Sequence, residues 1–355
     1  MNLMITGGAG FIGANLVLHW LQHHPDDLVI NFDALTYAGN LENLAEVKNH
    51  PKYRFVLGDL RNPADISKTF SKYHVDAVIH LAAESHVDRS IYGPADFIET
   101  NISGTFNLLE TARDYWKTDL SAHRFLHVST DEVYGSLGSC GKFLETTPYA
   151  PNSPYSASKA ASDHLVRAWH HTYKMNMLTT NCSNNYGPFQ FPEKLLPLLI
   201  NNCLQNLYIP VYGDGKNIRD WLFVKDHCEA LDCVFHSGKS GETYNIGGGN
   251  EWSNIDIVRY VCKELDQRLG RSKENSCEKL ITFVQDRPGH DLRYAIDASK
   301  IKTELNWTPR HTFGEGLSKT IEWYLGHQNW IKDITSGTYR EYYELQYGGQ
   351  NSDAV

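Results

Sequence analysis

The chain has 355 residues, of which 41% are hydrophobic and 21% charged, so we expect about two folded domains and little intrinsic disorder. Lys and Arg number 33 against 42 Asp and Glu, and this net charge of −9 argues against nucleic acid or an anionic membrane as the main partner. No apolar run is long enough to span a bilayer, and no basic and apolar leader opens the chain, so we expect a cytoplasmic protein.

The seven cysteines are scattered along the chain without a C-x-x-C pair, which indicates reduced thiols that mostly fill the core. The H-E-x-x-H motif is absent as well. The sequence therefore predicts no metal site.

Short aliphatic runs alternate with helical patterns through the first half of the chain. The expected strands are Leu3 to Ile5, Leu28 to Phe32, Arg54 to Leu57, Ala77 to Leu81 and Phe125 to Val128, and the expected helices include Asn15 to His23 and Thr100 to Tyr115. This alternation predicts an α/β fold with a Rossmann-type, doubly wound parallel sheet. Ligands of such sheets bind at the carboxyl ends of the strands.

A glycine-rich segment follows the first expected strand. Gly7, Gly10 and Gly13 fit G-x-x-G-x-x-G, and Gly8, Gly10 and Gly13 fit G-x-G-x-x-G. Glycines let the backbone turn tightly and approach a pyrophosphate at the N-terminus of the next helix. In this strand–loop–helix context the segment predicts dinucleotide binding rather than a simple turn.

Acidic and small residues follow the next three expected strands. Asp33 ends the second strand, where a carboxylate binds an adenosine ribose and repels a 2′-phosphate, although a simple cap is the alternative. Asp33 therefore predicts that the cofactor is NAD rather than NADP. Asp59 and Leu60 would hold the adenine, and Ala82 and Ala83 would pass beneath the cofactor.

Thr130, Asp131 and Glu132 follow the fifth expected strand. A helix cap or a turn would explain the two carboxylates without any chemistry. If both enter the site, one can remain protonated as an acid while the other is ionised as a base. Thr130 could bind the same substrate hydroxyl as a catalytic base.

Tyr155 and Lys159 are four residues apart in a segment that is expected to be helical as far as about Tyr173. They would therefore be neighbours on one helix face. A nearby cation lowers the pKa of a phenol, which makes Tyr155 a candidate base for a substrate hydroxyl during hydride transfer. The alternative is a surface pair without a function.

The regular alternation ends near residue 185, where prolines and glycine loops interrupt short elements. We predict a dinucleotide-binding domain over residues 1–185, with a return segment near 219–246. A smaller, mixed α/β substrate-binding domain is expected to occupy mainly residues 186–355.

Several of these segments resemble the extended short-chain dehydrogenase/reductase family, in its branch of NAD-dependent nucleotide-sugar epimerases and dehydratases. The segments that carry the resemblance are Gly7 to Gly13, Thr130 to Glu132, Tyr155 to Lys159, Asn181 to Pro188, Phe191 to Leu195, Ile218 to Trp221 and Asp286 to Asp291. The similarity extends over nearly the whole chain.

The resemblance implies a homodimeric hydro-lyase of deoxysugar biosynthesis that acts on a nucleotide-linked glucose, dTDP-glucose, with NAD as its cofactor. Tyr155 would remove the C4 hydroxyl proton, Glu132 would take the C5 hydrogen, and Asp131 would protonate the departing C6 hydroxyl. Lys159 would support Tyr155.

The resemblance also implies which residues contact the ligands. Besides the residues already named, the expected cofactor contacts are Phe11, Ile12, Leu81, Thr100 and Asn185. The expected substrate contacts are Ser85, Thr130, Asn184, Lys194, Leu195, Pro210, Tyr212, Arg219, Asn254, Arg287 and His290.

Three other functions remain open. A dehydratase for GDP-mannose, CDP-glucose or UDP-glucose would use the same reacting residues. A UDP-hexose 4-epimerase would need Tyr155 and NAD, but no acid and base at C5 and C6. A regulator that only senses NAD would be expected to lack Tyr155 or Lys159, and both are present.

Overall fold

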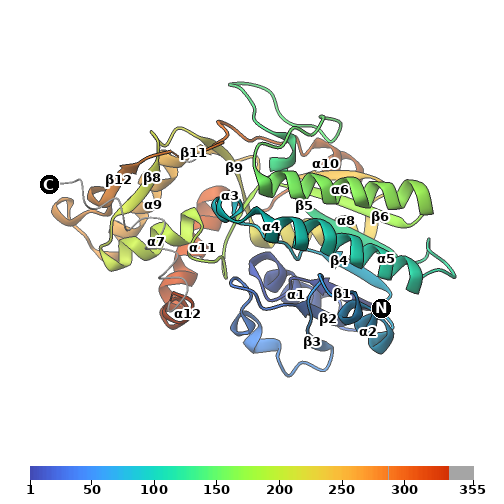
Figure 1. Ribbon diagram of the computed structural model, residues 1–355. Helices are drawn as coiled ribbons and strands as arrows, with labels where there is room; N and C mark the ends of the chain where they lie inside the picture. Colours follow the sequence, from blue (N-terminus) through green and yellow to red (C-terminus); the bar gives the residue numbers. More distant parts are fainter. Residues whose placement is uncertain (287, 336–355) are drawn as a thin grey trace.

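The computed structural model describes residues 1–286 and 288–335, and in this part of the chain the largest sheet is parallel and has seven strands in the order β10-β6-β5-β4-β1-β2-β3 (Figure 1). Its strands are β1 (Asn2–Thr6), β2 (Leu28–Asp33), β3 (Tyr53–Leu57), β4 (Ala77–His80), β5 (Arg124–Thr130), β6 (Asn176–Cys182) and β10 (Thr243–Ile246). The predicted Rossmann-type α/β fold is confirmed.

Helices cover both faces of this sheet. They are α1 (Phe11–His23), α2 (Pro63–Tyr73), α3 (Val87–Tyr92), α4 (Pro94–Phe97), the π-helix η2 (Ile98–Gly104), α5 (Thr105–Tyr115), α6 (Pro154–Tyr173), α8 (Val224–Ser237) and α10 (Ser299–Leu305). Short 3₁₀ turns are η1 (Leu41–Val47) and η3 (Asp131–Tyr134).

Alternate residues of the strands enter two different cores, because successive side chains of a strand point to opposite faces. Leu3 and Ile5 pack with side chains of α1 and α8. Met4 lies between them in sequence and packs on the other face with residues of α2 and α5. The buried strands are therefore apolar on both sides, as parallel strands under helices usually are.

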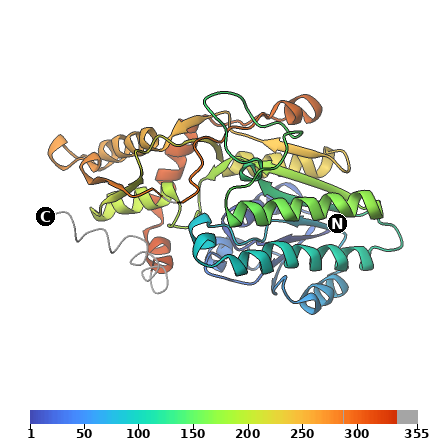
Figure 2. The same cartoon turned by 45° about the horizontal axis from the view of Figure 1, so that its top comes forward.

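A second group of elements lies beside the carboxyl ends of the large sheet (Figures 1 and 2). It contains a three-stranded sheet of β7 (Asn184–Tyr186), β9 (Ile218–Phe223) and β11 (Glu251–Ser253), and a pair of β8 (Ile209–Tyr212) with β12 (Ile281–Val284). Its helices are α7 (Leu195–Gln205), α9 (Asn254–Leu269), η4 (Lys273–Asn275), η5 (Cys277–Leu280), α11 (Phe313–Gly326) and α12 (Gln328–Ile334).

The chain passes from the large sheet to the second group and back. After β9 it forms α8, which packs against α1, and then β10, which pairs in parallel with β6. Both α8 and β10 fall within the predicted return segment near 219–246. The domain boundaries themselves remain a prediction. No helix in residues 1–286 and 288–335 is both long and apolar enough to cross a membrane.

We predict that Leu231→Ala, on α8, lowers the free energy of unfolding by about 2–5 kcal/mol, because it leaves a cavity in the core beneath the sheet. Leu231 is fully buried among residues of α1 and the large sheet. The matched control is Leu57→Ala, whose side chain is 66% exposed and should matter little. Urea unfolding followed by circular dichroism checks both, and equal effects would contradict this placement of α8.

Candidate active site

The glycine loop between β1 and α1 is packed so closely that side chains do not fit in it. A Cβ added at Gly13 would lie 2.0 Å from the carbonyl oxygen of Gly7, and one at Gly7 would lie 2.8 Å from the backbone of Ala82. Gly7 also has a φ of +71°, which favours glycine. The loop therefore leaves space for a pyrophosphate at the N-terminus of α1, which is an anion-binding position.

Asp33 is held at the carboxyl end of β2 by the neighbouring backbone. Its carboxylate accepts hydrogen bonds from the amides of Ala9, at 2.9 Å, and Leu35, at 2.8 Å. Burial raises the pKa of Asp33, and these two amides partly oppose that shift. The side chain thus both caps a turn and faces the space beside the glycine loop.

A cavity of about 480 Å³ opens where the strands of the large sheet end. Every residue predicted to contact the cofactor lines it, namely Gly7, Gly10, Phe11, Ile12, Gly13, Asp33, Asp59, Leu60, Leu81, Ala82, Ala83, Thr100, Tyr155, Lys159 and Asn185. Thr130, Asp131 and Glu132 line the same cavity. The structure therefore brings the predicted redox and elimination residues together.

The predicted substrate contacts are divided between this cavity and its surroundings. Ser85, Thr130, Asn184 and Lys194 line the cavity. Leu195, Pro210, Tyr212, Arg219, Asn254 and His290 are not among its lining residues, and Arg287 lies outside the described residues. The roles of all these residues remain predictions.

Two of the outlying residues are nevertheless close to each other. The ring of Tyr212, on β8, meets the ring of His290 edge-on, with the ring centres 6.2 Å apart. His290 also pairs with Asp286 at 2.6 Å. Tyr212, His290 and Asp286 thus form a polar and aromatic cluster beside β8. Leu195 and Asn254 begin α7 and α9 there.

Arg219 connects this second group electrostatically with the cavity. Its guanidinium is buried and donates hydrogen bonds to the carbonyls of Ile218, at 2.7 Å, and Asp291, at 2.9 Å. It also stacks over the ring of Tyr294. Its positive charge opposes the rise in the pKa of Asp131.

Asp131 and Glu132 begin a 3₁₀ turn directly after β5. The hydroxyl of Thr130 caps this turn by accepting a hydrogen bond from the amide of Glu132 at 3.3 Å. Asp131 is only 1% exposed, and its Oδ2 atom has no hydrogen-bond partner within the described residues. Burial, and then the charges of Glu132 and Asp220, raise the pKa of Asp131 well above its usual range. A carboxyl in this environment can be protonated and act as an acid.

Tyr155 and Lys159 lie one turn apart near the start of α6. Ser153 caps this helix, with Pro154 in its first turn, so that the sequence fixes where it begins. The ammonium of Lys159 donates a hydrogen bond to the carbonyl of Val128 at 3.0 Å.

The expected lowering of the pKa of Tyr155 is wrong for this structure. The pKa of Tyr155 is raised well above its ordinary value, first by burial and then by the negative charge of Glu132. A hydrogen bond from Thr130 lowers it only in part. Sequence spacing reveals the cation but not the burial and the carboxylates that oppose it.

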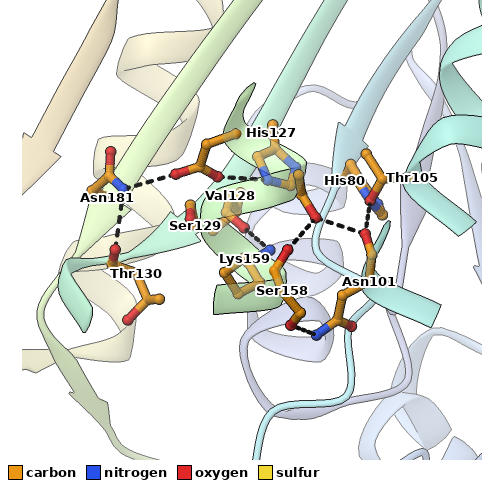
Figure 3. Close-up of polar contacts among 12 residues, drawn as sticks. His80, Asn101, Thr105, His127, Val128, Ser129, Thr130, Ser158, Lys159 and Asn181 are labelled. Carbon is orange, nitrogen blue, oxygen red and sulfur yellow. Dashed lines mark hydrogen bonds and ion pairs between the residues drawn. The ribbon is translucent and has the colours of Figure 1, made fainter. Parts of the chain in front are cut away.

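A buried polar network holds α6 against the sheet (Figure 3). Asn101, on the π-helix η2, donates a hydrogen bond to Ser158 at 2.8 Å, and its carbonyl accepts hydrogen bonds from Thr105 and Ser162. The hydroxyl of Thr105 contacts a ring nitrogen of His80 at 2.9 Å. These contacts fix the turn of α6 that carries Tyr155 and Lys159.

A second branch of the network reaches the end of β5 (Figure 3). His127 pairs with Asp163 at 3.1 Å, and Asn181 bridges Asp163 to the carbonyl of Thr130. Burial, and then the charge of Lys159, lower the pKa of His127 to about 4. His127 is therefore a neutral, structural histidine at neutral pH.

Several residues of the cavity were not predicted. Cys182 lines it, and burial raises the pKa of its thiol to about 12. Its position at the carboxyl end of β6 is the signal that could have found it. Tyr37 and Glu193 also line the cavity and are joined by a hydrogen bond of 3.0 Å. No local pattern relates these two residues, because they are far apart in sequence.

We predict that Gly13→Ala weakens dinucleotide binding by at least about tenfold, because the new methyl group would collide with backbone atoms of the glycine loop. Gly138→Ala is the matched control, since nothing lies within 4 Å of its added Cβ. Calorimetric titration with NAD measures both affinities. Unchanged binding by Gly13→Ala would exclude the loop as the pyrophosphate site.

We also predict that His127→Gln flattens the pH dependence of folding stability between pH 6.5 and 4. The pKa of His127 is about 4 in the folded protein, against about 6.5 in an unfolded chain. As the pH is lowered, the unfolded state therefore binds the proton before the folded state does. The free energy of unfolding then decreases by up to about 1.4 kcal/mol for each unit by which the pH is lowered. His164→Gln, at an exposed position, should leave the slope unchanged. Urea titrations across this range measure the slope, and an equal slope in His127→Gln would contradict the assignment.

Comparisons with known proteins agree with this geometry. The model of the GDP-mannose 4,6 dehydratase family matches residues 4–320. The dTDP-glucose 4,6-dehydratase of Xanthomonas campestris pv. campestris (strain B100) is 57% identical over 95% of this chain and 97% of its own length. That of Escherichia coli (strain K12) is 52% identical over 99% of this chain and 100% of its own.

Solved structures give the same result. A dTDP-glucose 4,6-dehydratase from Streptomyces venezuelae, crystallised with NAD and dTDP, has a TM-score of 0.87 and 45% identity, covering 94% of this chain and all of its own. The resemblance predicted from the sequence is thereby confirmed: the chain belongs to the nucleotide-sugar dehydratase family, in its group of dTDP-glucose 4,6-dehydratases.

Proposed function

We propose that this chain converts dTDP-glucose into dTDP-4-keto-6-deoxyglucose and water, with NAD bound in the cavity. The observation that carries the proposal is the presence of Asp131, Glu132 and Tyr155 in the same cavity as the glycine loop. The names of its relatives and the ligands of the Streptomyces venezuelae structure support both the substrate and the cofactor.

The residues of the cavity fit NAD. The glycine loop leaves room for the pyrophosphate, and the buried carboxylate of Asp33 suits a ribose without a 2′-phosphate. When bound, NAD would supply the hydride acceptor for oxidation at C4 and the hydride donor for reduction at C6. Asp59 and Leu60 would border the adenine, with Ala82 and Ala83 beneath the ring system.

Tyr155 acts as the base for the C4 hydroxyl, with Thr130 bound to the same hydroxyl. The carboxylates of Glu132 and Asp131 both raise the pKa of Tyr155. Protonation of Asp131 therefore removes one of the charges that oppose deprotonation of Tyr155. Lys159, buried one turn away, supplies a positive charge on the same helix face.

Elimination requires a base at C5 and an acid at C6. Once C4 is a ketone, its neighbouring C5–H bond is acidic, and Glu132 removes that proton. Asp131 donates a proton to the C6 hydroxyl, which leaves as water, and Glu132 returns its proton to C5 when the hydride is added at C6. The buried environment that raises the pKa of Asp131 suits this assignment of acid and base.

The same fold also supports epimerisation. A UDP-glucose 4-epimerase from Thermus thermophilus has a TM-score of 0.81 at 28% identity, covering 92% of this chain and all of its own. Epimerisation requires no acid and base at C5 and C6, so the buried Asp131 favours dehydration.

Dehydration of GDP-mannose, CDP-glucose or UDP-glucose would use the same reacting groups. The names of the relatives favour dTDP-glucose as the substrate.

The assembly and location are also proposals. We propose a homodimer, as the family resemblance implies. We propose a cytoplasmic location, because all seven cysteines are unpaired thiols and reduced thiols suit that compartment.

The proposed activity is tested by incubating the purified protein separately with dTDP-glucose, UDP-glucose, CDP-glucose and GDP-mannose. We expect dTDP-glucose to give a 4-keto-6-deoxy product, identified by NMR, at a rate well above the other three. Tyr155→Phe is the inactive control. Conversion of UDP-glucose into UDP-galactose without loss of water would identify an epimerase instead.

We predict that Asp131→Asn and Glu132→Gln impair different parts of the elimination. Asp131→Asn cannot donate an acidic proton, so loss of the C6 hydroxyl should slow by about 10² or more while C4 oxidation continues. Glu132→Gln should block exchange of the C5 hydrogen. Both variants are run in deuterated water, with the C5 position followed by NMR and bound NADH by absorbance. Wild-type C5 exchange in Glu132→Gln would rule out Glu132 as the base.

A further inference from the structure

Three histidines surround one carboxylate at the ends of α1 and α8, away from the proposed active site. Nε2 of His24 lies 2.9 Å from Oδ2 of Asp232, and Nδ1 of His236 lies 2.8 Å from Oδ1. Nε2 of His19 lies 2.8 Å from Oδ2. Since α1 begins at the glycine loop, its length of 13 residues places this cluster about 20 Å from the loop.

The cluster is partly buried but remains open to the solvent. The exposed fractions of the side chains are 18% for Asp232, 25% for His24 and 42% for His236. The ring of Trp20 stacks with the ring of His236 and lies against that of His24, so that one face of the cluster is aromatic. Small ions can reach the polar atoms, whereas their supporting residues are fixed in the core.

The charges at this position favour a cation. The carboxylate of Asp232 supplies negative charge, and its oxygens lie 2.8–2.9 Å from nitrogens of the three imidazoles. The C-terminal ends of α1 and α8 meet here, and helix C-termini attract positive charge. Asp27 adds a carboxylate nearby, although it pairs with the amino group of Met1.

We propose that His24, Asp232 and His236 form a Zn²⁺ site that is separate from the active site. Their ligand atoms all lie within 4.8 Å of one another. In a tetrahedral site with bonds of about 2.0–2.1 Å, two ligand atoms are about 3.3 Å apart. The two nitrogens lie 2.9 and 2.8 Å from oxygens of Asp232, so small side-chain movements would bring the three ligand atoms to that spacing. Two imidazoles and a carboxylate are common zinc ligands, and water completes the tetrahedron.

The remaining residues suit the supporting positions of such a site. Asp232 and His236 are four residues apart on α8, so both project from one helix face. His19 contacts the carboxylate oxygen Oδ2, which orients Asp232 as hydrogen bonds to metal-binding carboxylates usually do. The ion would tie the end of α1 to α8, and thus the first helix to the returning segment of the chain.

This inference revises the sequence prediction that the chain has no metal site. That prediction rested on the absence of cysteine pairs and of H-E-x-x-H. His24 and Asp232 are separated by 208 positions and meet only because α8 packs against α1. No local spacing could reveal the cluster.

Calorimetric titration of the NAD-loaded protein with ZnCl₂ tests the site. We expect one ion per chain to bind at this cluster, and its affinity to fall at least tenfold in His24→Gln and in His236→Gln. The matched control is His23→Gln, because His23 is adjacent in sequence but bonds the carbonyl of His19 rather than Asp232. Zn²⁺ should also raise the thermal midpoint of the parent and of His23→Gln only.

Two further measurements separate this site from the cysteines and from misfolding. Co²⁺ bound in place of Zn²⁺ should give visible bands without an intense sulfur-to-metal transition. Asp232→Asn, which keeps the shape of the side chain, should lose the ion but retain the dehydratase rate and circular dichroism of the parent. Zn²⁺ affinities equal to the parent's in His24→Gln and His236→Gln, or thiolate bands with Co²⁺, would overturn the proposal.

Discussion

The parallel pairing of β5 with β4 and β6 determines where the reacting groups can be. Thr130, the last residue of β5, is in register with Cys182 at the end of β6, and His127 is in register with His80 on β4. The chain turns after Thr130, so Asp131 and Glu132 lie at the carboxyl ends of the strands, where the glycine loop also lies. A shift of one residue in this register would turn the side chains of β5 to the opposite face and displace the turn that carries Asp131 and Glu132.

The site is buried and rich in negative charge, and this combination explains its electrostatics. Asp131 and Tyr155 each have a raised pKa because burial disfavours their charged forms and Glu132 lies nearby. Arg219 is a buried cation that opposes the shift at Asp131 from the second group of elements. Arg219 therefore influences the protonation of Asp131 without lining the cavity itself.

Local patterns in the sequence were sufficient for five strands of the large sheet, the glycine loop and the pairing of Tyr155 with Lys159 on one helix, whereas β6 and β10 were not among the expected strands. Each depends on residues that are close in sequence and on rules for strands, turns and helices. The pKa of Tyr155 could not be predicted in this way, because it depends on burial and on Glu132. Likewise, the contact between Tyr37 and Glu193 needs the tertiary fold, which brings distant segments together.

The position of β10 has a consequence for synthesis of the chain on the ribosome. β6 ends at Cys182, but its outer neighbour β10 begins only at Thr243, after β7, β8, β9 and α8 have been made. At translation rates of about 5–20 residues per second, the edge of β6 remains unpaired for several seconds. An unpaired edge strand can join other chains, so the nascent protein is exposed to aggregation and to chaperone capture during this interval.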